Sequence, residues 1–303
     1  MSKRQNVLVT GSDGYIGMHL TEMLKQEEYN VVSSTRNRKT NKTSMQLDFS
    51  KPSEVVNQKI NDIDFMIHTV SPNEILYKFD KYSALAESVA GTRAALDFCI
   101  KNNIKNFIYF SSFHVFGNQE GLLTENTIPE PLNDYGLSHY MAEQTIGVLD
   151  RREEVNAWIL RPSNLFGVPV DLEKFKRWNL IPFLFCKEAV EKQTITLMTS
   201  GLQLRNFVGI SDLFKKVLWV LQERPGGRVI HVNGKESISV FELAKLVQDI
   251  AYKKYGLSID INRPYGEGMI KKFDFKSIYD IAAPTENLYS FTEKMLGELL
   301  ARK

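Results

Sequence analysis

A tyrosine and a histidine one helical turn apart are the residues of this 303-residue chain that point most directly to chemistry. Tyr135 and His139 lie in a segment with helical periodicity, so their side chains face the same way. Far upstream, a turn that contains Gly11, Gly14 and Gly17 separates an apolar strand from a helix. Such a turn is typical of dinucleotide binding, and the Tyr135–His139 pair marks where a carbonyl or an alcohol would meet the dinucleotide.

Each glycine of this turn has a physical task. Gly11 permits the tight turn, Gly14 lets backbone amides approach a pyrophosphate, and Gly17 lets helix and strand pack closely. The motif is weak alone, and its alternative is a glycine turn in an empty fold, but its place between a strand and a helix favours dinucleotide binding. The residues of the turn that we predict to contact the cofactor are Gly11, Asp13, Gly14, Tyr15, Ile16 and Gly17.

The end of the second predicted strand bears on the choice of cofactor. An acidic residue there would accept hydrogen bonds from an adenosine ribose, but residues 33–39 contain no carboxylate. A hydroxyl at Thr35 with Arg36 and Arg38 suits a 2′-phosphate instead, so we predict NADP(H) in preference to NAD(H), which stays possible. The alternative is a solvated basic loop. Further on, Asp48 and Phe49 are predicted to contact the adenine, although Asp48 is equally suited to cap the following helix.

Composition narrows the class of protein. The 38 basic and 36 acidic residues give a formal charge of +2, so the composition indicates no large basic surface for binding nucleic acid or a membrane. The two cysteines, Cys99 and Cys186, lie in apolar surroundings without metal-ligand spacing, so we expect reduced core residues and no metal site. No apolar run reaches about 18 residues and no apolar signal segment opens the chain, which predicts a cytoplasmic protein.

Short apolar runs alternate with helical periods through the first half of the chain. This rhythm predicts a doubly wound α/β fold, a Rossmann-like parallel sheet covered on both faces. The rhythm breaks after residue 167, which indicates a smaller lobe built from discontinuous pieces. We predict a dinucleotide-binding domain over residues 1–166, to which residues 206–232 return, and a substrate-binding lobe over residues 167–205 and 233–303.

Several short motifs follow one another in a recognisable order. They are Thr10-Gly11-Ser12-Asp13-Gly14-Tyr15-Ile16-Gly17, Asp48, His68-Thr69-Val70-Ser71, Ser111-Ser112-Phe113-His114-Val115-Phe116-Gly117, Tyr135 to His139, Leu160-Arg161-Pro162-Ser163-Asn164-Leu165-Phe166-Gly167, Asn179-Leu180-Ile181-Pro182 and Arg205-Asn206-Phe207-Val208. Each is weak alone, but together and in this order the chain resembles the extended short-chain dehydrogenase/reductase family, the NAD(P)-dependent nucleotide-sugar epimerases, dehydratases and reductases. The match spans nearly the whole chain.

The resemblance implies roles for individual residues. Ser112 is similar to the family's active-site hydroxyl and Tyr135 to its general acid/base. Asn164 and Asn179 are implied to contact a nucleotide diphosphate, which Arg205 and Arg263 would clamp, although a loop cap or a surface ion pair are the alternatives. The same resemblance implies further cofactor contacts at Thr69, Val70, Ser71 and Pro162, and further substrate contacts at Ser71, Ser112, Phe113 and His114.

His139 departs from the family, which carries lysine at this position to lower the pKa of the tyrosine and to hold the nicotinamide ribose. A histidine is largely neutral at pH 7, so it can bind a ribose hydroxyl but gives Tyr135 little constant charge. Three hypotheses remain. His139 replaces the lysine with a changed pH profile; the enzyme works only as a reductase; or catalysis is lost and the protein only binds the dinucleotide as a sensor or scaffold.

The two residues after Ser112 help to choose among the reactions that this family catalyses. The family's dehydratases carry an Asp-Glu pair there, whereas this chain has Phe113 and His114, which disfavours water elimination. Epimerases of the group hold NAD through a ribose-binding carboxylate that is absent here. We therefore predict an NADP(H)-dependent oxidoreductase that reduces a keto group of a nucleotide-linked sugar, with Tyr135 as proton donor; an epimerase with tightly bound NAD is the alternative. By family analogy we expect a homodimer through the helices of residues 82–101 and 135–149.

Overall fold

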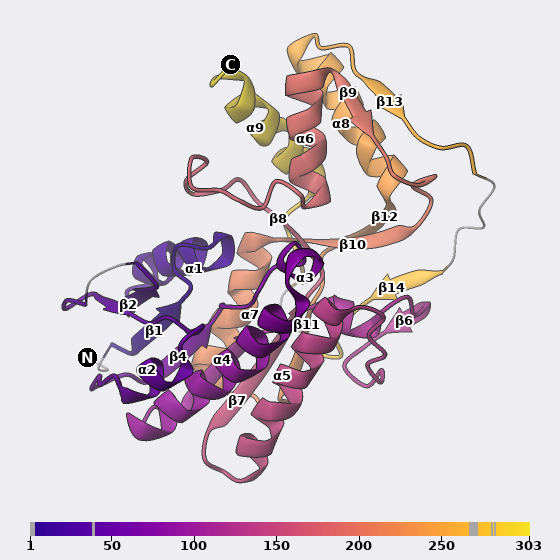
Figure 1. Cartoon of the computed structure of the whole chain (residues 1–303). Coiled ribbons are helices and arrows are strands. Elements are labelled where there is room, and N and C mark those ends of the chain that lie inside the picture. The colour runs from indigo at the N-terminus through magenta and orange to yellow at the C-terminus, as the bar shows by residue number, and fades with distance from the viewer. Residues whose placement is uncertain (1–3, 38–39, 267–271, 280, 282) are drawn as a thin grey trace. The chain divides into compact units, whose positions relative to one another are not determined.

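The computed structural model describes residues 4–37, 40–266, 272–279, 281 and 283–303 and divides into two compact units. The first unit comprises residues 1–119, 127–161 and 217–230, and the second comprises residues 120–126, 162–216 and 231–303. Figure 1 shows the elements of both units.

A seven-stranded sheet forms the centre of the first unit, in the order β11-β7-β5-β4-β1-β2-β3. Neighbouring strands from β3 to β7 pair in parallel. The strand order reverses between β1 and β4, and ligands of doubly wound folds bind beyond the carboxyl ends of the strands at such a point. The strands are β1 (Asn6–Thr10), β2 (Asn30–Thr35), β3 (Ser44–Gln46), β4 (Phe65–His68), β5 (Asn106–Phe110), β7 (Asn156–Pro162) and β11 (Val229–Val232).

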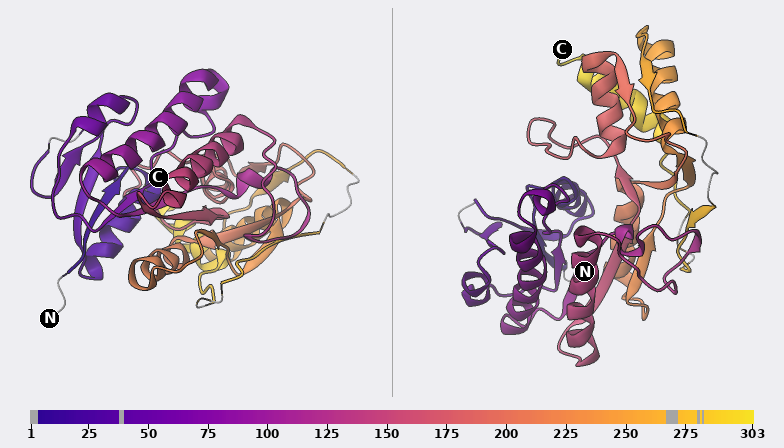
Figure 2. Two further views of the ribbon diagram at one scale, coloured as in Figure 1. Left: turned by 90° about the horizontal axis from the view of Figure 1, so that it is seen from below. Right: turned by 45° about the vertical axis from the view of Figure 1, so that its right-hand side comes forward.

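Helices cover both faces of this sheet. On one face α4 packs between α2 and α5, and Figures 1 and 2 show α4 and α5 running side by side. Their apolar side chains meet those of Leu8, Met66, Phe107 and Tyr109 in one buried core. On the other face α1 packs against β1 and β2. The helices are α1 (Tyr15–Gln26), α2 (Pro52–Asn57), the short α3 (Leu76–Phe79), α4 (Lys81–Lys101), the 3₁₀ helix η1 (Phe113–Phe116), α5 (Asp134–Arg151) and α7 (Ile210–Glu223), which runs from the second unit into the first.

The second unit combines small sheets with three helices that pack on one another. Its longest helix, α8, begins with a capping box in which Ser239 and Glu242 bind each other's backbone amides, and it ends at Gly256 in the left-handed conformation. The elements are β6 (Gly121–Leu123), β8 (Asn164–Phe166), α6 (Ile181–Lys192), β9 (Thr194–Thr196), β10 (Leu204–Gly209), β12 (Glu236–Ser239), α8 (Val240–Tyr255), β13 (Asp260–Asn262), β14 (Phe273–Phe275) and α9 (Leu288–Leu300).

The predicted fold class is confirmed, since the sheet and its flanking helices are those of a doubly wound α/β protein. Cys99 and Cys186 are buried, free thiols, as predicted. The divisions between the units differ from the predicted ones: residues 120–126 lie in the second unit because β6 pairs with β14, which follows about 150 residues later in the chain.

Candidate active site

The glycine turn joins β1 to α1 as predicted. Gly11 has a φ of 69°, and a Cβ on Gly17 would collide with the carbonyl oxygen of Gly11, so only glycine permits this approach of helix to strand. Gly14 is the N-cap of α1 and has no side chain to bind the first-turn amides. The turn therefore has the form of an anion cradle at a helix N-terminus.

The segment after β4 lies directly against this turn. The hydroxyl of Thr69 donates to the carbonyl oxygen of Thr10 at 2.7 Å, and a Cβ on Gly11 would come within 2.7 Å of the same hydroxyl. A methyl group of Val70 would lie 3.1 Å from the same added Cβ. Two of the predicted cofactor contacts, the turn and residues 69–71, are thus brought together at the carboxyl edge of the sheet.

The predicted 2′-phosphate residues occupy the end of β2. Thr35 is buried and its hydroxyl accepts from the amide of Asn37 at 3.3 Å, while the Arg36 side chain is exposed. Arg38 lies outside the described residues. Asp48 accepts hydrogen bonds from both the amide and the hydroxyl of Ser50, so its carboxylate caps the turn before α2.

Two buried aromatic side chains fill the space between the strand ends and the helices. Phe49 is 2% exposed and packs edge-on against His68, with the ring centroids 4.7 Å apart. His68 binds the Thr10 hydroxyl through Nδ1 at 2.9 Å, and burial lowers its pKa from 6.5 to about 3. His68 is therefore a neutral core residue.

The start of α5 carries the predicted catalytic tyrosine. The side chain of Asn133 caps the helix by accepting from the amide of Gly136 at 2.8 Å. Gly136 packs on the carbonyl of His114 in η1, at a distance that leaves no room for a Cβ. This contact sets the rings of His114 and Tyr135 edge to face, with centroids 5.5 Å apart. Ser112 is the N-cap of η1; it is buried, and its hydroxyl accepts from the His114 amide at 3.2 Å.

His139 follows Tyr135 at 4.7 Å between ring centroids and is almost fully buried. Its Nε2 lies 3.5 Å from the hydroxyl of Ser71, in the segment that packs on the glycine turn, and its Nδ1 lies 2.9 Å from the phenol of Tyr109 on β5. The structure thus places Tyr135, His139, His114 and Ser71 in one cluster, with Ser112 at its edge.

Sequence reasoning missed three residues of this cluster. Glu143, one turn after His139, forms a buried bidentate pair with Arg161 (2.9 and 2.6 Å) and accepts from Ser111 at 2.5 Å. The helical spacing of residues 135, 139 and 143 could have revealed Glu143. Tyr109 could not have been found without the fold. Tyr77 of α3 packs on the Tyr135 ring and donates to the Ser138 hydroxyl at 2.6 Å, and burial raises the pKa of its phenol.

The predicted substrate residues of the second unit have separate environments. Asn164 donates to the backbone carbonyl of Asn206 at 2.9 Å, Pro162 is buried at the end of β7, and Asn179 is exposed just before α6. Burial lowers the pKa of Arg205 on β10. The guanidinium of Arg263 lies 3.7 Å over the ring of Phe241 and donates to the Ser200 carbonyl at 2.8 Å.

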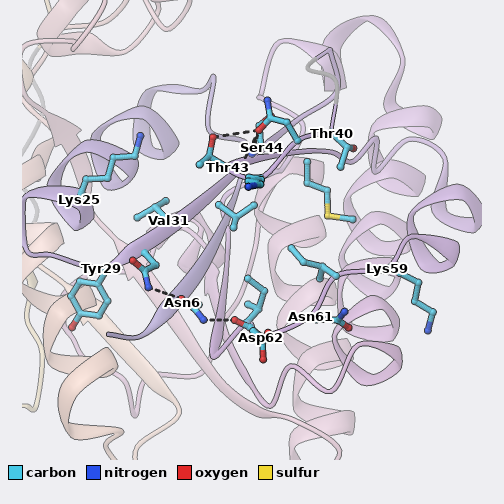
Figure 3. Close-up of a pocket in the computed structure, with 17 residues that line it drawn as sticks. Asn6, Lys25, Tyr29, Val31, Thr40, Thr43, Ser44, Lys59, Asn61 and Asp62 are labelled. Carbon is cyan, nitrogen blue, oxygen red and sulfur yellow. Dashed lines mark hydrogen bonds between the residues drawn. The ribbon is translucent and has the colours of Figure 1, made fainter. Parts of the chain in front are cut away.

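A cavity of about 560 Å³ opens elsewhere in the first unit, at the amino ends of β1, β2 and β4 (Figure 3). Exposed polar side chains such as Lys25, Lys59 and Asn61 line it above a floor that includes Val31 and Met45. None of the predicted site residues lies among those lining it. This cavity is therefore separate from the cluster around Tyr135.

Neither a metal centre nor a membrane-spanning helix is found in the described part of the chain. No group of three or more histidine, cysteine, aspartate or glutamate side chains in those residues could hold a metal ion. No helix among them has the length and apolar character needed to cross a membrane.

Comparison with known proteins agrees with the geometry. The profile of the NAD dependent epimerase/dehydratase family matches residues 7–233. A protein of Bacillus subtilis named uncharacterized UDP-glucose epimerase YtcB is 24% identical over 82% of this chain and 83% of its own length. A dTDP-4-dehydro-6-deoxy-D-allose reductase of a Streptomyces species is 25% identical over 86% of each chain. The structure of MoeE5, solved with UDP-glucuronic acid and NAD, superposes with a TM-score of 0.81 at 20% identity over 98% of this chain and 99% of its own.

Proposed function

Because the chain belongs to the NAD dependent epimerase/dehydratase family, we propose that it transfers a hydride between a nicotinamide dinucleotide and a nucleotide-linked sugar, as a reductase that consumes NADPH. The observation that carries this proposal is the cluster at the start of α5. Tyr135, His139 and Ser71 come together there beside the glycine turn, through contacts of 4.7 Å between rings and 3.5 Å between polar atoms.

The dinucleotide would supply the hydride, and side chains of the protein would neutralise the negative charge that forms on the substrate oxygen. Addition of hydride to a ketone produces an alkoxide, which needs a proton donor and a hydrogen bond to its oxygen. Tyr135 donates the proton and the Ser112 hydroxyl polarises the carbonyl. His139 and Ser71 would hold the nicotinamide ribose, and the glycine turn and residues 69–71 would hold the rest of the dinucleotide. Thr35 and Arg36 would bind the 2′-phosphate; Arg38, the third residue predicted there, lies outside the described residues.

We infer reduction, and not oxidation, from the presence of His139 where the family has a lysine. An epimerase must first oxidise its substrate, so its tyrosine has to lose a proton, and a phenol with an ordinary pKa of about 10 does so poorly at neutral pH. A reductase needs that same phenol protonated. Tyr135 has the rings of His139 and Tyr77 against its own and no lysine one helical turn away, which suits a proton donor better than a base.

The substrate's diphosphate is assigned to the second unit, with Asn164, Asn179, Arg205 and Arg263 as its contacts. Arg263 is suited to this task because stacking on Phe241 and the hydrogen bond to Ser200 already orient its guanidinium. Guanidinium groups bind phosphate oxygens in bidentate geometry. Phe113 and His114 would line the sugar subsite of the first unit.

Assembly as a homodimer is part of the proposal. On α5, Leu137, Met141 and Val148 share one side of the helix and are 39%, 41% and 37% exposed, and Tyr82 at the start of the neighbouring α4 is 77% exposed. A second copy of this stripe would cover it by two-fold symmetry. Sedimentation of the wild-type protein and of M141E tests this, because a dimer formed by this face would dissociate in the variant. The predicted cytoplasmic location remains a prediction.

The relatives favour one second candidate, an epimerase with tightly bound NAD, since YtcB is named an epimerase and MoeE5 was solved with NAD. The test follows nicotinamide absorbance while purified protein meets NADPH or NADH and a panel of nucleotide-linked 4-keto sugars. Oxidation of NADPH supports the reductase. Release of NAD on denaturation, with no consumption of added NADPH, supports the epimerase. Binding of NADPH without turnover by either route supports a sensor or scaffold and contradicts both.

A further inference from the structure

The two ring nitrogens of His139 face different partners. Nδ1 lies 2.9 Å from the phenol oxygen of Tyr109, and Nε2 lies 3.5 Å from the hydroxyl of Ser71. Tyr109 is on β5, is completely buried, and belongs to the core between the sheet and helices α4 and α5. A neutral imidazole carries one proton, so the partner at Nδ1 decides what Nε2 can offer.

Proton counting decides the direction of the Tyr109 hydrogen bond. Burial, reinforced by the negative charge of Glu143, raises the pKa of Tyr109 well above 10, so the phenol keeps its single proton. Within the described part of the chain, the only hydrogen bond of this phenol with good geometry is the one to Nδ1 of His139. If Nδ1 carried the proton, the buried O–H of Tyr109 would have to exchange this 2.9 Å acceptor for a poorer one, which is the more costly arrangement.

Thr92 on α4 is the other hydroxyl that influences Tyr109, and its hydrogen bond lowers the pKa of the phenol. The proton of Thr92 is already donated to the carbonyl of Ser88, at 2.7 Å. Thr92 could therefore only accept from Tyr109, in competition with Nδ1. The 2.9 Å contact makes Nδ1 the preferred acceptor.

We propose that Tyr109 is a positioning residue that donates its proton to Nδ1 and thereby fixes His139 as the Nε2–H tautomer. Nε2 then presents a hydrogen-bond donor on the side of Ser71. On the basis of the proposed function, this donor binds a hydroxyl of the nicotinamide ribose. His139 thus supplies a directed N–H without the fixed positive charge of an ammonium group, and Tyr109 acts on the reaction only through His139.

The test is nitrogen NMR of ¹⁵N-histidine-labelled protein, freed of nucleotide, at pH 8, where a histidine of ordinary pKa is neutral. H139Q identifies the His139 resonances among those of the five histidines. The chemical shifts of its two nitrogens report which one carries the proton. Y109F removes only the phenol oxygen, and T92V, which removes the competing hydroxyl, is the matched control.

The expected result is an Nε2–H imidazole in the wild-type protein and in T92V, and a mixture of tautomers in Y109F. The Kd for the cofactor should also rise about 3-fold to 10-fold in Y109F, the effect of losing one oriented hydrogen bond, with kcat at saturating cofactor much less affected. An Nδ1–H tautomer in the wild-type protein, or an unchanged tautomer in Y109F, would overturn the proposal. The tautomer is measured without cofactor, so it stands or falls separately from NADPH-dependent turnover, whose loss would overturn only the proposed function.

Discussion

The two ends of the seven-stranded sheet differ in how their polar groups are held. At the carboxyl ends several polar side chains are buried and hydrogen-bonded to one another: Thr10 binds His68, Tyr109 binds His139, and Ser111 joins the Glu143–Arg161 pair. At the amino ends a cavity of about 560 Å³ is lined by exposed side chains such as Lys25, Lys59 and Asn61.

This difference shows that the end of the sheet with the described cavity is not the end with oriented polar groups. Burying polar groups is unfavourable unless each is satisfied, so a buried network that is fully paired fixes the geometry of its members. Exposed lysines and asparagines above an apolar floor keep their rotamer freedom and orient nothing. We therefore expect function to depend on the carboxyl end.

Replacing Tyr135 by phenylalanine should have the largest effect, because it removes the proposed proton donor and leaves the ring contacts in place. We expect kcat to fall about 10²-fold to 10⁴-fold, with the Kd for NADPH changed less than about 2-fold. Y140F is the matched control, since Tyr140 lies on the same helix but on another side of it. Turnover that survives in Y135F would remove Tyr135 from the mechanism and the carboxyl end from its central role.

Acid should destabilise the carboxyl end through His68. Its pKa is about 3 in the folded protein and 6.5 in an ordinary environment. Between these values the unfolded state binds the proton and the folded state does not, so this contribution to stability is complete above about pH 6.5 and is lost as the pH falls.

The expected loss is about 1.4 kcal/mol per pH unit in the free energy of unfolding. Urea unfolding of the wild-type protein and of H68N between pH 6.5 and pH 4.5 measures it, since the variant lacks this proton uptake. Parallel pH dependence of the two proteins would contradict the assignment of a neutral, buried His68.

Local sequence predicted the parts of the carboxyl end that depend on local geometry. Gly11, Gly14 and Gly17 lie where the motif places them, because a turn between a strand and a helix is determined by adjacent residues. The doubly wound fold is also confirmed, since its alternating strands and helices are long and periodic. The roles given to Ser112 and Tyr135 were carried by family resemblance and remain predictions.

Contacts between distant segments could not be predicted. Tyr109 reads as an ordinary strand residue, and its bond to His139 depends on how β5 and α5 pack. The helix α6 lies beyond residue 167, where the regular rhythm of the sequence breaks, and the sequence analysis did not predict it, although Pro182 is at a position where helices accept proline. The pairing of β6 with β14 joins segments about 150 residues apart, for which a single sequence carries no signal.

Charge reversal at Arg36 should distinguish the two cofactors. Arg36 is exposed at the end of β2, where the 2′-phosphate is proposed to bind, so R36E should weaken NADPH about 10-fold or more and NADH by less than about 2-fold. K42E makes the same change in charge at a residue that lines the amino-end cavity and should affect both cofactors equally and little. Equal weakening of NADPH and NADH by R36E would argue against the 2′-phosphate site.

Truncation in the amino-end cavity should have the smallest effect. Lys59 is exposed and its only hydrogen bond in the described residues, to the carbonyl of Lys101, is long at 3.4 Å; Asn61 is also exposed. The double variant K59A/N61A should therefore keep kcat, KM and cofactor Kd within about 2-fold, and its free energy of unfolding within about 0.5 kcal/mol of the wild type for each substitution. A larger loss of turnover in a protein of unchanged stability would show that the amino end takes part in function. That result would remove the contrast between the two ends, because exposed side chains around a cavity would then contribute what we assign to the buried network around His139.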